Sequence, residues 1–109
     1  MNTVYCVIVD VSPQAEVDWA EWNRRHHIPE VLDEPGFIRA KRYRADTSPG
    51  EWPRYVIAYE LSSREALDGY LNGPAVARLR ADHTQRFGVV TRISRLVLTP
   101  ADEIAARRG

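Results

Sequence analysis

Apolar and polar positions along the chain predict four β-strands. Residues 3–11 (TVYCVIVDV) are apolar and β-branched almost without a break, which indicates a strand that is covered on both faces. Three further strands are predicted at residues 37–45 (FIRAKRYRA), 54–61 (RYVIAYEL) and 89–98 (VVTRISRLVL). Between the second and third strands, residues 46–53 are rich in turn formers and predict a mobile loop.

Helical periodicity marks the first connection. Residues 14–27 place charged side chains on one side and apolar ones on the other, which predicts an amphipathic helix capped by Ser12. Pro29 is expected to stop or kink this helix, because its ring disfavours helical geometry in the preceding residue. A short helical turn over residues 29–34 is expected to follow.

The second long connection predicts two helices. Ser62 and Glu65 have the spacing of a capping box for a helix over residues 63–72. A second helix is expected over residues 74–86 and should end at Gly88.

The resulting order, β-α-β-β-α-β, is typical of a ferredoxin-like α+β fold, with a four-stranded antiparallel sheet and helices on one face. We expect one such domain at residues 1–100 and a polar tail at 101–109. Because both side-chain parities of the strands are largely apolar, the second sheet face should be covered by a partner. The pattern therefore predicts a homodimer formed through the sheet, a dimeric α/β barrel.

The composition of the chain argues against several classes of function. The chain of 109 residues has 15 basic and 15 acidic residues, so its net charge provides no attraction to nucleic acid or anionic membranes. The single Cys6 excludes a disulfide framework and is expected to be a small buried apolar residue. No apolar stretch is long enough to span a bilayer, and the N-terminus lacks the pattern of a signal peptide. We therefore expect a cytoplasmic protein.

Four motifs stand out along the chain: WAEWNRRHHIPE at residues 19–30, PGF at 35–37, RY at 42–43 and YEL at 59–61. Together they resemble the EthD-like family (ethyl tert-butyl ether degradation protein) of the dimeric α/β-barrel superfamily. The resemblance covers residues 3–98 and implies the ferredoxin-like fold and the sheet-to-sheet dimer.

The resemblance also implies site residues. The histidine that it carries over is His27, and the aromatic residue before it is Trp22. The next position, often aromatic in such sequences, is Asn23 here. Members of the superfamily include cofactor-free monooxygenases, isomerases, polyketide cyclases and lyases, so the resemblance implies the fold more closely than the reaction.

Two histidines are the candidate catalytic residues. His27 lies on the inward side of the first helix and is suited to general acid–base work near neutrality; alternatively, its ring satisfies backbone groups freed by Pro29. His83 lies on one helical stripe with Val76 and Leu79 and should face the sheet, as a second catalytic group or as a core histidine. If both helices cover one sheet face, the two histidines meet in one cavity.

Aromatic and amide side chains are the candidate substrate-binding residues. These are Trp19, Trp22, Asn23, Tyr43 and Tyr59. The alternative for the tyrosines is packing, which is their usual role in strands, and the sequence leaves open which sheet face each occupies. Basic residues on the second strand, among them Arg42 and Arg44, either hold an anionic substrate or keep an edge strand soluble.

Metal and cofactor motifs are not expected. The pair His27 and Glu30 has a spacing seen in helical metal sites, but Pro29 interrupts the helix between them. The sequence has no glycine-rich phosphate loop and no serine nucleophile motif.

Three hypotheses follow. The first is a cofactor-independent lyase, isomerase, cyclase or monooxygenase that acts on a small cyclic or aromatic oxygenated metabolite through histidine acid–base chemistry. The second is a non-catalytic metabolite binder or accessory dimer in a catabolic or biosynthetic pathway. The third, RNA binding, shares the order of elements but is disfavoured by the zero net charge and by a third strand without the glycines of that motif.

Overall fold

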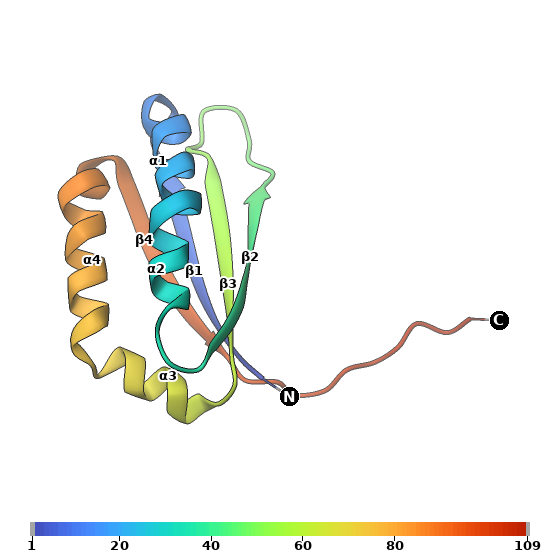
Figure 1. Cartoon of the computed structure of the whole chain (residues 1–109). Helices are drawn as coiled ribbons and strands as arrows, with labels where there is room; N and C mark the ends of the chain where they lie inside the picture. Colours follow the sequence, from blue (N-terminus) through green and yellow to red (C-terminus); the bar gives the residue numbers. More distant parts are fainter. Residues whose placement is uncertain (1, 109) are drawn as a thin grey trace.

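A computed structural model describes residues 2–108 and confirms the expected ferredoxin-like α+β architecture (Figure 1). Four antiparallel strands form one sheet in the order β2-β3-β1-β4. The strands are β1 (Thr3–Val11), β2 (Phe37–Ala45), β3 (Arg54–Leu61) and β4 (Thr91–Leu98). The central strands are therefore β1 and β3, and β4 pairs with β1 at one edge of the sheet.

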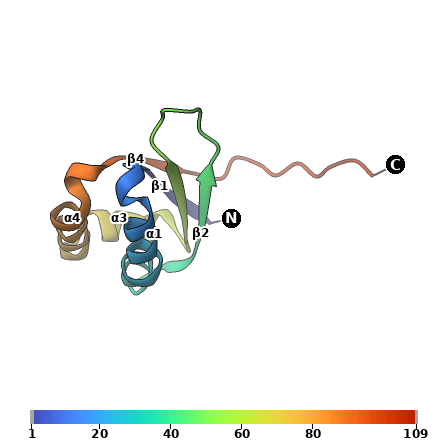
Figure 2. The ribbon, with the colours of Figure 1, turned by 90° about the horizontal axis from the view of Figure 1, so that it is seen from above.

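The helices all lie on one side of the sheet (Figure 2). They are α1 (Glu16–Trp22), α2 (Ile28–Leu32), α3 (Arg64–Leu71) and α4 (Pro74–Phe87). Two 3-10 turns, Pro13–Ala15 and Gly88–Val90, connect this layer to the ends of β1 and β4. Among residues 2–108, no helix lies on the opposite side of the sheet.

Pro29 does not stop the first helix, so of the two outcomes expected from the sequence, a stop or a kink, the stop is wrong. A π-helical turn (Asn23–His27) joins α1 to α2, and the Ile28 N–H bonds to the Asn23 carbonyl five residues earlier. A π turn is wider than an α turn, so it relieves the crowding between the proline ring and the carbonyl four residues before it. Ile28 consequently keeps helical geometry, with φ −59° and ψ −48°.

Two predicted helix and strand ends also differ. Ser63, and not Ser62, caps α3, because its hydroxyl oxygen accepts a hydrogen bond from the Ala66 N–H at 3.0 Å. The fourth strand begins at Thr91 and not at residue 89, since the chain first makes a 3-10 turn after α4. Val89 is left 96% exposed in that turn.

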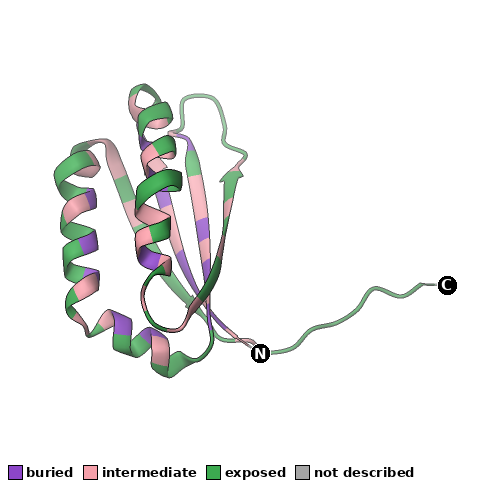
Figure 3. Ribbon diagram, viewed as in Figure 1, coloured by how far each residue is buried: buried purple, intermediate pink, exposed green. Residues whose placement is uncertain are grey.

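The core lies between the sheet and the helices (Figure 3). Its fully buried side chains are Val11, Trp19, Ile57, Leu61, Leu67 and Leu79. They come from strand positions of one parity and from the inward stripes of α1, α3 and α4. Burying each such side chain contributes about 1.5–3 kcal/mol to folding.

The other parity of the strands forms what we call the open face. It presents Val4, Cys6 and Ile8 of β1, Val56 and Ala58 of β3, and Leu96 and Leu98 of β4. Leu96 and Leu98 are 52% and 46% exposed, and they lie opposite Cys6 and Val4 of β1, so the apolar side chains form one patch. The structure therefore has the second apolar face that the strand pattern predicted.

Beyond β4, residues 99–108 extend away from the domain without regular structure (Figure 1). Within the part of the chain that the structure describes, none of the helices has the length and apolar character needed to cross a membrane.

Candidate active site

A narrow cavity of about 40 Å³ lies between the sheet and the helices α1, α2 and α4. Its walls come from alternate residues of β1, β3 and β4 and from the inward faces of the helices. The lining residues are Tyr5, Val7, Val9, Trp19, Asn23, His27, Val31, Ile57, Tyr59, Tyr70, Leu79, Arg80, His83, Ile93 and Arg95. Apolar walls with a few converging polar groups are typical of small-molecule sites.

His27 and His83 meet in this cavity. The π turn carries His27 and α4 carries His83, and their ring centroids lie 5.8 Å apart in an edge-on arrangement. Trp22 packs against both rings, with centroid distances of 5.1 Å to His27 and 5.6 Å to His83. Two helices that are distant in the sequence thus bring the two histidines onto one sheet face.

A buried hydrogen bond fixes the state of His83. The Trp19 Nε1–H donates to His83 Nε2 at 3.0 Å. Because an indole nitrogen can only donate, His83 is neutral here with its hydrogen on Nδ1. Burial lowers the pKa of His83, and the positive charge of Arg95 lowers it further, which agrees with the neutral ring.

His27 differs from His83 in its hydrogen bonding. Its Nδ1 atom is buried and has no hydrogen-bond partner among the described residues. This atom therefore does not satisfy the backbone groups near Pro29. Burial lowers the pKa of His27 to about 4, with smaller lowering effects from His83 and Arg95 that are partly opposed by Asp82.

Asn23 and a β2 arginine support the π turn. Arg42 Nη1 donates to the Ala20 carbonyl at 2.7 Å and to Asn23 Oδ1 at 3.2 Å. Asn23 itself is only 2% exposed and lines the cavity. The guanidinium thus anchors the end of α1 and the start of the π turn to the sheet, and it helps to place His27.

Three tyrosines form the lower wall of the cavity. Tyr5 stacks on Tyr59 at 6.2 Å between ring centroids and meets Tyr70 edge-on at 6.3 Å. Burial raises the pKa of Tyr59 far above its usual value and that of Tyr70 to about 12. These hydroxyls stay protonated at neutral pH and can donate hydrogen bonds to a ligand.

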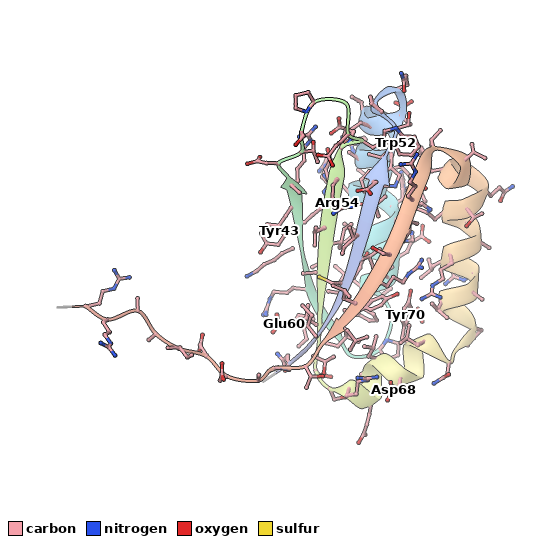
Figure 4. The ribbon with its side chains drawn as sticks, turned by 180° about the vertical axis from the view of Figure 1, so that it is seen from behind. Tyr43, Trp52, Arg54, Glu60, Asp68 and Tyr70 are labelled. Carbon is pink, nitrogen blue, oxygen red and sulfur yellow. The ribbon has the colours of Figure 1, made fainter. Side chains whose placement is uncertain are left out.

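Two of the residues expected to bind substrate lie outside the cavity lining. Tyr43 is 55% exposed and pairs with Val56 on the open face, so it points away from the helices (Figure 4). Tyr70, in contrast, lies beside β4 and α4 in the same view. Trp22 stands behind His27 and His83, where it packs on Phe87 and beneath Arg86. The cavity lining therefore includes Trp19, Asn23 and Tyr59 but neither Tyr43 nor Trp22.

Sequence reasoning did not single out Tyr5, Arg80 and Arg95. Arg80 Nη2 donates to Tyr5 Oη at 3.0 Å. For the two arginines, the sequence held a weak indication of an inward position. Arg80 precedes His83 by almost one helical turn, and Arg95 lies on the same side of its strand as Ile93. An arginine among charged neighbours gives no indication of a cavity until its strand and helix are paired.

Among residues 2–108, no group of three or more His, Cys, Asp or Glu side chains is arranged to hold a metal ion. Glu30, which has a metal-like spacing from His27, instead lies 3.9 Å from Arg78 in an ion pair.

The fold of this chain is similar to that of several solved structures. An EthD family protein from Bacillus halodurans is 16% identical, with a TM-score of 0.63 over 94% of this chain and 99% of that chain. A variant of SnoaB, a cofactor-independent oxygenase from Streptomyces nogalater, is 15% identical, with a TM-score of 0.70 over 97% and 100%. The ActVA-Orf6 monooxygenase of Streptomyces coelicolor, solved with nanaomycin D, is 18% identical, with a TM-score of 0.69 over 97% and 93%.

These similarities confirm the EthD-like resemblance at the level of the fold. Comparison with curated proteins gave no significant match. A family model described as a domain of unknown function, DUF4286, matches residues 2–100, and the chain belongs to that family.

Proposed function

We propose that the protein is a cofactor-independent enzyme that moves a proton on a small cyclic or aromatic oxygenated metabolite, with His27 as the acid–base group. The observation that carries this proposal is the buried Nδ1 of His27, which has no partner among the described residues and lies next to His83. Leaving a buried polar atom unpaired costs roughly 1–3 kcal/mol. A ligand that hydrogen-bonds to the imidazole recovers that free energy.

The other cavity residues have supporting roles in this proposal. Trp19 holds His83 in one tautomer, which leaves the Nδ1–H of His83 as a donor for the substrate or for His27. Tyr59 and Tyr70 donate hydrogen bonds to a substrate carbonyl. An acid–base group such as His27 can assist a lyase, an isomerase or cyclase, or a monooxygenase reaction by moving a proton to or from the substrate.

The closed cavity is small. Its volume of about 40 Å³ is far below the roughly 300–1,000 Å³ typical of sites for drug-sized ligands. A ring needs more space than this, so we propose that a cyclic ligand enters once the exposed Arg80 and Arg95 side chains at the mouth swing aside.

We also propose that the protein works as a homodimer through the open face. The exposed Leu96 and Leu98 and the half-buried Val56 would be covered by the same strands of a second copy. The one cysteine, Cys6, is a free thiol on that face, in keeping with a reducing compartment, and we place the dimer in the cytoplasm.

The test compares three proteins on a panel of nanaomycin D, hydroxynaphthoquinones and cyclic 1,3-diketones. Absorbance and oxygen consumption report turnover for the wild type, His27→Asn and His26→Asn. We expect His27→Asn to lower the rate by roughly 10²- to 10⁴-fold. His26→Asn changes an exposed neighbour on the same turn and should keep the wild-type rate. Full turnover by a folded His27→Asn protein would falsify the proposal.

A non-catalytic metabolite binder is the second candidate. It is favoured by the Trp19–His83 hydrogen bond, which occupies one of the acceptor atoms in the cavity. A non-catalytic binder would bind compounds of the panel without converting them. His27→Asn would then change the affinity for these compounds, and neither the wild type nor the variant would show turnover.

A further inference from the structure

The mouth of the cavity carries two positive charges. Arg80 of α4 and Arg95 of β4 line it, and both side chains are exposed, whereas the remaining lining residues are buried or half-buried. The cleft between α4 and β4 is therefore the side from which a ligand enters.

These two arginines differ from most others in the chain. Across residues 2–108, eight arginines lie within 4.0 Å of a carboxylate oxygen: Arg24, Arg25, Arg39, Arg44, Arg54, Arg64, Arg78 and Arg86. Arg80 and Arg95 form no such pair in that part of the chain. The lining residues include no aspartate or glutamate, and nearby Asp82 is bound to Arg86 at 3.0 Å. The mouth is thus a region of positive potential.

We infer that Arg80 and Arg95 bind the carboxylate of a small cyclic ligand whose ring enters the cavity. The location of the ring beside His27 rests on the proposed function, but the carboxylate contact does not require any histidine chemistry. A planar guanidinium presents paired N–H groups that match the two oxygens of a carboxylate.

Tyr5 adds a third donor. Because Tyr5 Oη accepts a hydrogen bond from Arg80, its own hydrogen is free to point toward a ligand. Tyr5 is 4% exposed and stacked on Tyr59, so its hydroxyl is held in place before any ligand arrives. A fixed donor loses little entropy on binding.

A bound carboxylate has a consequence for the histidines. The charge of Arg95 is one of the causes that lower the pKa values of both His27 and His83. An anion beside Arg95 opposes this contribution, whereas the lowering of both pKa values by burial, which is their main cause, remains. Both histidines therefore stay neutral when the carboxylate is bound.

The test is a binding comparison of benzoate and benzamide, which have similar shape and differ in charge. Fluorescence of the tryptophans and NMR shifts follow the titrations. We expect wild-type protein to bind benzoate at least 10-fold more tightly than benzamide. Arg80→Gln and Arg95→Gln should each weaken benzoate binding by about 10- to 100-fold and leave benzamide binding unchanged. Arg80→Lys and Arg95→Lys retain the charge and should keep part of the affinity.

Arg78→Gln is the matched control, because Arg78 is exposed on α4 and pairs with Glu30 outside the cavity. Wild-type benzoate affinity is expected for this variant. The inference is overturned if wild-type protein does not bind benzoate at millimolar concentration, if it binds both probes equally, or if all three glutamine variants lose affinity alike. Thermal unfolding checks that each variant is folded.

The two proposals fail separately. Suppose that binding is charge-selective and depends on Arg80 and Arg95, but His27→Asn does not change turnover. This result would support the carboxylate site and contradict the proposed enzyme activity. Turnover that depends on His27, without a preference for benzoate over benzamide, would support the proposed enzyme activity and contradict the carboxylate site.

Discussion

The two faces of the sheet are built from alternate residues of the same strands and differ in almost every property. On the helix-covered face, Val9, Ile57 and Tyr59 are at most 2% exposed, and the histidine cavity lies above them. On the open face, Leu96 and Tyr43 are 52% and 55% exposed. The covered face is packed within one chain, and the open face is apolar without a cover from its own chain.

Polar groups differ between the faces as well. The covered face holds the neutral, buried Trp19–His83 pair, with the charged Arg80 and Arg95 only at the mouth of its cavity. The open face holds exposed ion pairs, including Arg54 with Asp10 and Arg39 with Glu60. Exposed pairs of this kind contribute little to stability, but their charges restrict which surfaces can dock against the sheet. The comparison indicates that the covered face determines folding and contains the candidate site, whereas the open face has the apolar surface on which the proposed dimer depends.

The largest expected difference between the faces is in the free energy of unfolding. Ile57→Ala removes a side chain that is 1% exposed on the covered face and should cost about 4 kcal/mol. Val56→Ala, the adjacent residue on the open face, should cost about 1 kcal/mol at protein concentrations too low for association. Urea denaturation measures both, and equal losses would contradict the division between the faces.

Gly36, which directly precedes β2, lies in close contact with helix α3. Its φ is +86°, and an added Cβ would lie 2.3 Å from the Ala66 Cβ of α3. Gly36→Ala should therefore destabilise the fold by about 3 kcal/mol, from backbone strain and overpacking together. Gly50, with φ +88° and no atom within 4 Å of an added Cβ, is the control, and Gly50→Ala should cost only about 1 kcal/mol. Similar losses at both glycines would show that α3 yields at this contact.

The covered face should also make stability depend on pH. An unfolded histidine titrates near pH 6.5, whereas His27 titrates at about 4 in the folded state. As the pH falls below 6.5, the unfolded chain binds the proton first, so the stabilisation is complete above this pH and is lost on the way to pH 4.

Between pH 7.5 and 4.5, this effect should lower the free energy of unfolding of the wild type by about 2.5 kcal/mol more than that of His27→Asn. Denaturant titrations at both pH values give the difference, and other titrating groups cancel in the comparison. His26→Asn, in an exposed position, should follow the wild type. An unchanged pH dependence in His27→Asn would mean that the ring is not buried in its neutral form.

The smallest predicted effect concerns the open face. Leu96→Arg places a charge on an apolar surface and should weaken the proposed dimer at least 10-fold, about 1.4 kcal/mol, while the monomer keeps its fold. Sedimentation equilibrium measures the association, and Val17→Arg, on an exposed α1 position, is the control. A stable wild-type monomer at micromolar concentration would remove the dimer from the proposal.

The sequence alone determined the order of elements and the inward faces of two helices. Strand periodicity and turn residues suffice for the β-α-β-β-α-β order, because both are local properties. The helical stripe that includes Leu79 and His83 is buried as its spacing predicted. Likewise, Trp19 and Asn23 lie on the inward side of the first helix, at 0% and 2% exposure.

Only the tertiary structure decided which polar side chains share the cavity. Alternation along β2 fixes that Tyr43 and Arg42 point in opposite directions, but the pairing with β3, with a register shift between Phe37 and Arg39, decides which of them faces the helices. The π turn before Pro29 likewise depends on packing, because its hydrogen-bond pattern and the Arg42 contact across to β2 are not encoded in local propensity. Periodicity determines the direction of a side chain within its own element, whereas the register between elements determines which side chains meet.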